Sequence, residues 1–172
     1  MRIRLRKAEK EDITQLAELF KGTVRGANAA DYSLEETEDW VSCGDRTEHW
    51  EELISRLYFV VAEQVEGRKN RFMYSQQAGE KGIVGFAAVS DGGYLNSMFV
   101  HKDCQRCGIA RILLQEMENY ARSKGIDRLF SEVSITARPF FETEGYAVVK
   151  EQRRRAGQLE LKNFVMEKKL DK

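Results

Sequence analysis

The stretch QRCGIA at residues 105–110 joins an apolar, strand-like run at residues 95–100 to an amphipathic helix pattern. A chain that passes from a strand into a helix in this way leaves several backbone N–H groups unpaired around the helix N-terminus. The helix dipole adds partial positive charge where those donors converge, so the stretch predicts an anion site, above all for phosphate. Gly108 permits close backbone approach, and Arg106 can add a charge-assisted contact.

The same stretch excludes two common nucleotide-binding motifs. It lacks the Lys-Ser/Thr pair of a Walker A loop, which argues against a nucleoside triphosphate with Mg²⁺, and it is not the GxGxxG of a dinucleotide site. Taken alone, the pattern also fits a helix start that binds nothing. The segments around it therefore decide between these interpretations.

The bulk composition indicates a single soluble domain spanning residues 1–172. Lys plus Arg and Asp plus Glu both number 28, and this balance gives no reason to expect nucleic acid or a membrane as partner. The charged N-terminal stretch predicts no secretory signal, and three cysteines without disulfide-framework spacing suit a reducing environment. We therefore expect a cytoplasmic protein.

Periodicity and turn residues predict alternating strands and helices along the chain. Asp12 is expected to cap a helix that Gly22 ends, a Ser33–Glu36 capping box to start a short helix, and Gly125 to stop the helix after the loop. Strands are expected at residues 2–8, 58–65, 82–90, 94–100, 129–134, 146–151 and 159–168, and helices also at 47–57 and 137–144. The basic stretch 67–81 is expected to connect two strands of a hairpin, and residues 153–155 to form a turn.

This order predicts an α/β (α+β) fold with one mixed, mostly antiparallel sheet of six to seven strands flanked by about four helices. In the helix after the loop, an apolar stripe faces the core, and Arg111, Glu118 and Arg122 fall on the opposite, polar face.

Four features in register resemble the GCN5-related N-acetyltransferase (GNAT) superfamily. The loop at residues 105–110, after the strand SMFVHKD, is similar to the Q/R-x-x-G-x-G/A acyl-CoA-binding motif. The segment ARPFFETEGY at residues 137–146 resembles the family's A-x-x-F-Y-E-x-x-G-F, and the opening IRLRKAEKED and closing FVMEKKL fit its first and last strands. The resemblance implies an N-acetyltransferase fold that binds acetyl-CoA as co-substrate.

Carried over by position, the resemblance implies roles for particular residues. Backbone groups of Met98, Phe99 and Val100 would pair with the pantetheine arm of the coenzyme. Amides of the loop would wrap its pyrophosphate: Gln105, Arg106, Cys107, Gly108, Ile109 and Ala110. Two positions beside the cofactor depart from the family pattern, because Ser134 stands where many members carry Asn, and Phe141 where many carry a Tyr thought to protonate the departing thiolate.

Acetyl transfer to an amine needs a proton acceptor, because freeing the lone pair of an alkyl amine at neutral pH costs roughly 4–5 kcal/mol. Glu132 shares a strand face with Ser134 and is the candidate general base, with a salt-bridged Glu at the rim as the alternative. Tyr146 is the candidate replacement for the missing acid, with a core aromatic as the alternative, and Tyr94 is similarly placed. The oxyanion is expected to bind a backbone N–H of the strand containing Phe99.

The irregular segment RGANAADY offers Arg25, Asn28 and Tyr32 as acceptor-binding candidates, with caps and turn formers as the alternative. The string H-x-x-C-x-x-C at residues 101–107 has no obvious fourth zinc ligand, so we expect no metal site.

The sequence therefore predicts an N-acetyltransferase for an amine, most simply a small molecule, by direct transfer in a ternary complex. A non-catalytic acyl-CoA sensor is the alternative, and a thiol or metal sensor using Cys104 and Cys107 a weaker one. A homodimer formed through a terminal strand also fits such a sheet.

Overall fold

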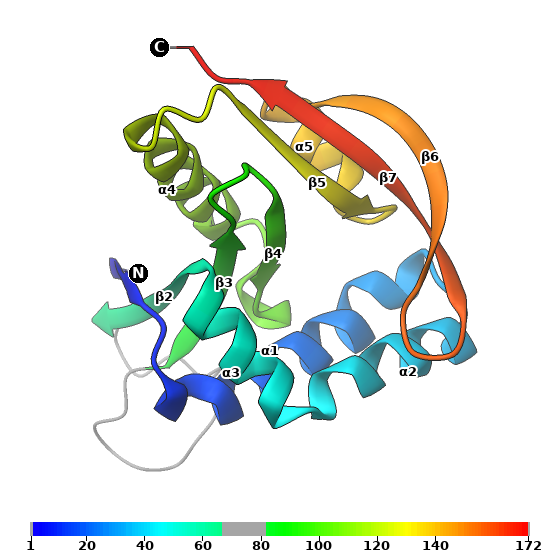
Figure 1. The fold of residues 1–172 in the computed structure, drawn as a ribbon. Coiled ribbons are helices and arrows are strands. Elements are labelled where there is room, and N and C mark those ends of the chain that lie inside the picture. Colours follow the sequence, from blue (N-terminus) through cyan, green and yellow to red (C-terminus); the bar gives the residue numbers. More distant parts are fainter. Residues whose placement is uncertain (1, 67–81, 172) are drawn as a thin grey trace.

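The computed structural model describes residues 2–66 and 82–171, so the predicted hairpin connection at 67–81 lies outside the described residues. Seven strands form two antiparallel groups (Figure 1). The first group has the order β1 (Arg2–Lys7), β2 (Tyr58–Glu66), β3 (Ile83–Val89), β4 (Leu95–Val100). The second has the order β5 (Arg128–Ser134), β7 (Glu160–Lys169), β6 (Ala147–Arg155).

Helices cover both faces of the four-stranded group, which is why all seven residues of β3 are buried. The helices α1 (Ile13–Gly26), α2 (Leu34–Ser42) and α3 (Thr47–Arg56) lie on one side of this group, and α4 (Ile109–Ser123) lies on the other (Figure 1). The short helix α5 (Arg138–Thr143) packs on β5 of the second group. Each side has its own apolar core: α1 and α3 pack on Phe59, Val61 and Phe86, and α4 packs on Val60, Ala87 and Leu129. Short 3₁₀ turns also occur at η1 (Lys10–Asp12), η2 (Asn28–Ala30), η3 (Cys43–Asp45) and η4 (Lys102–Cys104).

The two groups of strands meet between the start of β4 and β5. The Phe130 N–H donates to the Gly93 carbonyl at 3.0 Å, and the Ser131 hydroxyl donates to the Leu95 carbonyl at 2.7 Å. Gly93 has a φ of 83°, and a Cβ there would lie 2.4 Å from the Arg128 carbonyl oxygen. Beyond this junction β4 and β5 diverge (Figure 1). The predicted fold class is thus confirmed, with its sheet split between β4 and β5.

The local expectations are mostly confirmed. The Ser33–Glu36 capping box starts α2, with N···O distances of 3.1 and 2.9 Å, and Gly125 ends α4 at a φ of 72°. Gly22 does not end α1, because Thr23 and Val24 continue its buried stripe to Gly26.

Three further expectations need correction. Asp12 occupies the N-cap position of α1, but its carboxylate does not cap that helix, because it accepts hydrogen bonds from Arg6 and from the Glu9 N–H. Residues 153–155 belong to β6, and the turn follows at residues 156–159. Glu118 is 6% exposed instead of lying on the polar face, because Lys168 and Tyr146 bind its carboxylate. Within the described ranges, the structure contains no helix long and apolar enough to cross a membrane.

Candidate active site

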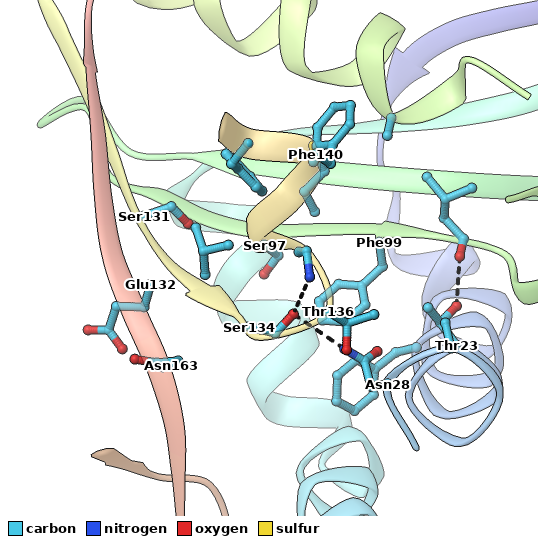
Figure 2. A pocket seen from close by; sticks show the side chains of 18 of the residues that line it. Thr23, Asn28, Ser97, Phe99, Ser131, Glu132, Ser134, Thr136, Phe140 and Asn163 are labelled. Carbon is cyan, nitrogen blue, oxygen red and sulfur yellow. Dashed lines mark hydrogen bonds between the residues drawn. The ribbon is translucent and has the colours of Figure 1, made fainter. Parts of the chain in front are cut away.

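A cavity of about 880 Å³ opens where β4 and β5 diverge, a volume within the range of small-molecule sites. Figure 2 shows side chains from both strands directed into it. Four surfaces line the cavity: the loop before α4, an aromatic wall from α1, α2 and β4, the polar face of the β5-β7-β6 group, and α5. Segments that are distant in sequence therefore meet at one site.

The loop before α4 has the backbone shape of an anion nest. Arg106 has a φ of 59° and Gly108 a φ of 81°, so two left-handed residues alternate with ordinary ones and turn consecutive N–H groups toward one point. In the part of the chain that the structure describes, the N–H groups of residues 106–108 have no hydrogen-bond acceptor. The first hydrogen bond into α4 is from the Ile112 N–H to the Gly108 carbonyl at 3.1 Å, which leaves the N–H groups of residues 109–111 at the helix N-terminus.

The predicted loop residues line the cavity, with the exception of Cys107, whose side chain is exposed. The Gln105 amide donates to the Val100 carbonyl at 2.7 Å and so ties the loop to the end of β4. The Thr23 hydroxyl of α1 donates to the same oxygen at 2.9 Å (Figure 2). Thr23 was not found from the sequence, although it continues the helical spacing of Leu16 and Phe20.

A glycine on β3 sets the height of α4 above the sheet. A Cβ at Gly85 would lie 3.0 Å from side-chain atoms of both Ile109 and Leu113. Since Ile109 is the first residue of α4 and 1% exposed, this contact positions the helix N-terminus against the sheet. The anion nest is therefore fixed by packing on one side and by the Gln105 hydrogen bond on the other.

The outer edge of β4 presents backbone groups to the cavity. The His101 N–H donates to the Val84 carbonyl at 2.9 Å. Going back along β4 from His101, the backbone N–H and C=O groups of successive residues point alternately toward β3 and away from it. In this register the backbone N–H and C=O of Phe99 pair with those of Phe86 on β3. The backbone groups of Met98 and Val100 point away from β3, toward the cavity side of β4. The prediction for the Phe99 backbone is therefore not supported, and its side chain instead lines the cavity.

Two predicted residues of β5, Glu132 and Ser134, line the cavity on the same strand face (Figure 2). The Ser134 hydroxyl oxygen accepts hydrogen bonds from the Ala137 N–H at 3.1 Å and the Asn28 amide at 3.4 Å. Glu132 accepts a hydrogen bond from Arg154 Nε at 3.1 Å, and its side chain is 27% exposed. Glu132 therefore both lines the cavity and forms a salt bridge with Arg154.

The two predicted aromatic positions near α5 differ in placement. Phe141 lines the cavity and packs edge-on against Phe140 and Tyr146, with ring centroids 5.6 and 5.2 Å apart. Tyr146 is not among the lining residues; its hydroxyl donates to Glu118 at 3.2 Å and it is 3% exposed. Burial, followed by the nearby Glu118 carboxylate, raises the pKa of Tyr146 far above 10. The prediction of Tyr146 as an acid is therefore wrong, because its hydroxyl is committed to the core.

The predicted acceptor residues also separate. Asn28 and Tyr32 line the cavity, and the Tyr32 hydroxyl accepts from the Ile135 N–H at 3.0 Å while donating to the Lys162 carbonyl at 2.7 Å. Arg25 is not among the lining residues and pairs with Glu38 at 2.8 Å on the surface. The structure thus does not bring Arg25 to the site. Tyr94 does line the cavity, and burial raises its pKa.

An aromatic wall lies on the α1–α2 side of the cavity and was not predicted. Phe20, Trp40 and Phe99 contact one another edge-on, with ring centroids 5.0, 6.2 and 6.3 Å apart. Tyr32 extends the wall against Trp40 at 5.6 Å. These residues are far apart in sequence, so no local pattern could assemble them.

The cysteines of the loop are not placed as a reactive pair. Cys107 is exposed, while burial raises the pKa of the Cys104 thiol and so lowers its thiolate fraction. Within residues 2–66 and 82–171, no group of three or more His, Cys, Asp or Glu side chains is arranged to hold a metal ion.

Comparison with known proteins gives one consistent result. Residues 28–170 match the family model described as an acetyltransferase (GNAT) domain. The chain is 27% identical over 151 residues to the uncharacterized N-acetyltransferase YafP of Escherichia coli K12, covering 88% of this chain and 85% of that protein.

Two solved structures share the fold over nearly the whole chain. A GCN5-related N-acetyltransferase from Rhodopseudomonas palustris, described as a class-II aminotransferase, aligns with a TM-score of 0.85 and 24% identity, covering 99% of this chain and 97% of that one. The PaiA N-acetyltransferase of Thermoplasma acidophilum, solved with coenzyme A, aligns with a TM-score of 0.72 and 22% identity, covering 98% and 99%. Since the family model spans most of the residues that build this cavity, the chain belongs to the GNAT acetyltransferase family.

Proposed function

We propose that the protein is an N-acetyltransferase that moves the acetyl group of acetyl-CoA directly to a primary amine of a small molecule in a ternary complex. The observation that carries the proposal is the meeting of two features at one cavity: the anion nest at residues 106–110 and the open backbone edge of β4. A coenzyme with a pyrophosphate and an amide-containing arm complements both. The Thermoplasma relative was solved with coenzyme A, which supports the same assignment.

The nest is suited to the pyrophosphate because its N–H groups and the N-terminal end of the α4 dipole both attract negative charge. Arg106 and Arg111 line this end of the cavity, although Arg111 also pairs with Glu144 at 2.7 Å. The amides of the pantetheine arm can pair with the outward backbone groups of Met98, in the manner of an added strand. The thioester would then lie where β4 and β5 diverge.

The chemistry requires a base near that point, and Glu132 is the carboxylate that lines this part of the cavity. Glu132 accepts a proton from the acceptor ammonium, and the freed lone pair attacks the thioester carbonyl carbon. The outward N–H of Met98 or Val100 stabilises the oxyanion. The attacking nitrogen then carries a positive charge and gives up a second proton to solvent. As the tetrahedral centre collapses, the new C–N bond remains, the C–S bond breaks, and the sulfur leaves with the electron pair.

The leaving thiolate receives no proton from residue 141, because Phe141 has no hydroxyl. A thiol pKa of about 8.5 makes the thiolate a tolerable leaving group, so transfer proceeds without this acid. The thiolate is then protonated by solvent at neutral pH.

Incubation of the purified protein with acetyl-CoA and a panel of alkyl, arylalkyl and peptide amines tests the proposal. We expect release of free thiol together with an acetylated amine seen by mass spectrometry, and a loss of kcat of about 100-fold or more in Glu132→Gln. Tight binding of acetyl-CoA without turnover on any amine would contradict the proposal and favour a non-catalytic acyl-CoA sensor.

A further inference from the structure

The polar face of the β5-β7-β6 group carries an ion pair that crosses the middle strand. Glu132 of β5 lies opposite Val165 of β7, and Arg154 of β6 lies opposite Leu161. Side chains at residues 161, 163 and 165 point to the same face, because strand residues alternate. The Glu132–Arg154 bond, 3.1 Å long, therefore passes over the side chain midway between them, Asn163.

Asn163 lines the cavity next to Glu132, as Figure 2 shows. Its Oδ1 is buried and has no hydrogen-bond partner among the described residues. The same holds for Nε2 of Gln152, its cross-strand neighbour. Buried polar atoms of this kind are rare, because each forfeits its hydrogen bonds to water. The cavity floor beneath the ion pair thus presents an acceptor that needs a donor.

Two acceptors consequently converge on one position, the Glu132 carboxylate and the Asn163 carbonyl oxygen. A primary ammonium is complementary to them, because it carries a positive charge and three N–H donors in a compact group. Arg154 already places a cation beside Glu132, but its side chain is 60% exposed. Exposed ion pairs of this kind are weak, so a ligand can replace Arg154 at small cost.

Building on the proposed function, we propose that the acceptor binds as a primary ammonium that displaces Arg154 and is held between Glu132 and Asn163 Oδ1. Arg154 then acts as a competitor that stays paired with the Glu132 carboxylate until the acceptor arrives. One ammonium N–H bonds to Asn163, and the proton shared with Glu132 is the one that Glu132 removes. Asn163 and Arg154 are positioning and specificity residues in this arrangement, while Glu132 carries the proton.

Calorimetric titration tests this inference without turnover, using the protein saturated with coenzyme A, which has no acetyl group to transfer. The probes are 2-phenylethylamine, whose ring suits the aromatic wall, and the neutral isostere 2-phenylethanol, both at pH 7. We expect the amine to bind more tightly than the alcohol. Asn163→Leu should weaken amine binding about tenfold, and Arg154→Met should tighten it several-fold, with little change for the alcohol.

Asn163→Asp extends the test, because a second carboxylate at the same position should tighten amine binding. Glu167→Gln is the matched control: Glu167 lies on the same face of β7 and pairs with Arg128 at 2.9 Å, but it does not line the cavity. It should bind both probes as the wild type does. Circular dichroism and coenzyme A affinity should be unchanged in each variant, which separates loss of the subsite from loss of folding.

The inference is overturned if the wild type does not prefer the amine over the alcohol, or if Arg154→Met and Asn163→Leu leave the amine affinity unchanged. These outcomes are separate from failure of the proposed function. A protein that binds amines as described but never acetylates them contradicts catalysis and leaves the ammonium subsite standing. A protein that acetylates amines with unchanged KM in both variants supports catalysis and contradicts the subsite.

Discussion

Phe141 is the residue where the chain departs from its family pattern in a way that bears on chemistry. Phe141 lines the cavity and lies edge-on to Phe140 and Tyr146, so a hydroxyl added to its ring would extend from a fixed position. If departure of the thiolate limits turnover, Phe141→Tyr should raise kcat about tenfold or more, because general acids contribute on the order of 10²–10⁴-fold. Steady-state thiol release at several pH values measures this. Unchanged kcat would show that thiolate departure does not limit the rate.

Tyr32 illustrates how a predicted binding residue can have a structural role. Its hydroxyl joins the α1–α2 side of the cavity to the β5-β7-β6 group through Ile135 and Lys162. Tyr32→Phe leaves both backbone groups without this partner and should lower the free energy of unfolding by about 1–3 kcal/mol. Urea unfolding measures the loss. Tyr120→Phe is the control, because its exposed hydroxyl donates to the Asp91 side chain and its loss should cost less; equal losses would contradict the assignment.

At the scale of elements, the loop before α4 depends on one side-chain amide. Gln105→Ala removes the hydrogen bond to the Val100 carbonyl but keeps the backbone N–H groups of the nest. We expect the Kd for acetyl-CoA to rise about five- to tenfold, since the loop loses about 1 kcal/mol of preorganisation. Fluorescence titration of the tryptophans measures this. An unchanged Kd would mean that packing at Gly85 suffices to hold the loop.

The tip of the β6–β7 hairpin is held against α2 by the carboxylate of Asp39. Asp39 accepts hydrogen bonds from the N–H groups of Gly157, Gln158 and Leu159 at 2.9, 2.7 and 3.0 Å. These bonds, the one from Gln158 first, hold the pKa of Asp39 below 3.8. A depressed pKa means that the attachment is complete above pH 3.8 and is lost as the pH falls through the lower, folded-state value.

We therefore expect the amide resonances of Gly157 and Gln158 to titrate together in NMR spectra below pH 3.8. Asp39→Asn should abolish that titration, because the amide cannot ionise. Gly157 cannot be used as the site of change, since a Cβ there would lie 2.8 Å from the Asp39 carboxylate. A midpoint at or above pH 3.8 would contradict the assignment.

The elements predicted well are those whose causes are local. The α2 capping box, the stop at Gly125 and the strand–loop–helix around Gly108 each depend on residues within one turn of one another, so periodicity and turn chemistry suffice. Glu118 was misplaced because its partners Lys168 and Tyr146 come from distant segments. The same limit applies to the site: the nest could be predicted, whereas Asn163 and the aromatic wall required the register of β7 and the packing of α1 and α2.

At the scale of the whole molecule, the cavity exists because two groups of strands join at one end and separate at the other. The joint is narrow: the Phe130 N–H bonds to the Gly93 carbonyl, Ser131 bonds to Leu95, and the Gly93 Cα sits against the Arg128 carbonyl. In the proposed function, acetyl-CoA and the acceptor meet at this opening, so we expect its geometry to couple stability to function. A change that widens the joint should disturb both.

Gly93→Ala is the sharpest test of that coupling, and Gly92→Ala is its matched control. At Gly93 the φ of 83° disfavours any side chain, and the new Cβ would lie 2.4 Å from a backbone oxygen that cannot rotate away. We expect a loss of about 3 kcal/mol in the free energy of unfolding, from backbone strain and overpacking together, and weaker acetyl-CoA binding in the folded fraction. At Gly92 the nearest atom to a new Cβ would be the Ser90 hydroxyl at 3.7 Å, so stability and binding should stay near the wild type. Equal behaviour of the two variants would show that the joint between β4 and β5 does not set the shape of the site.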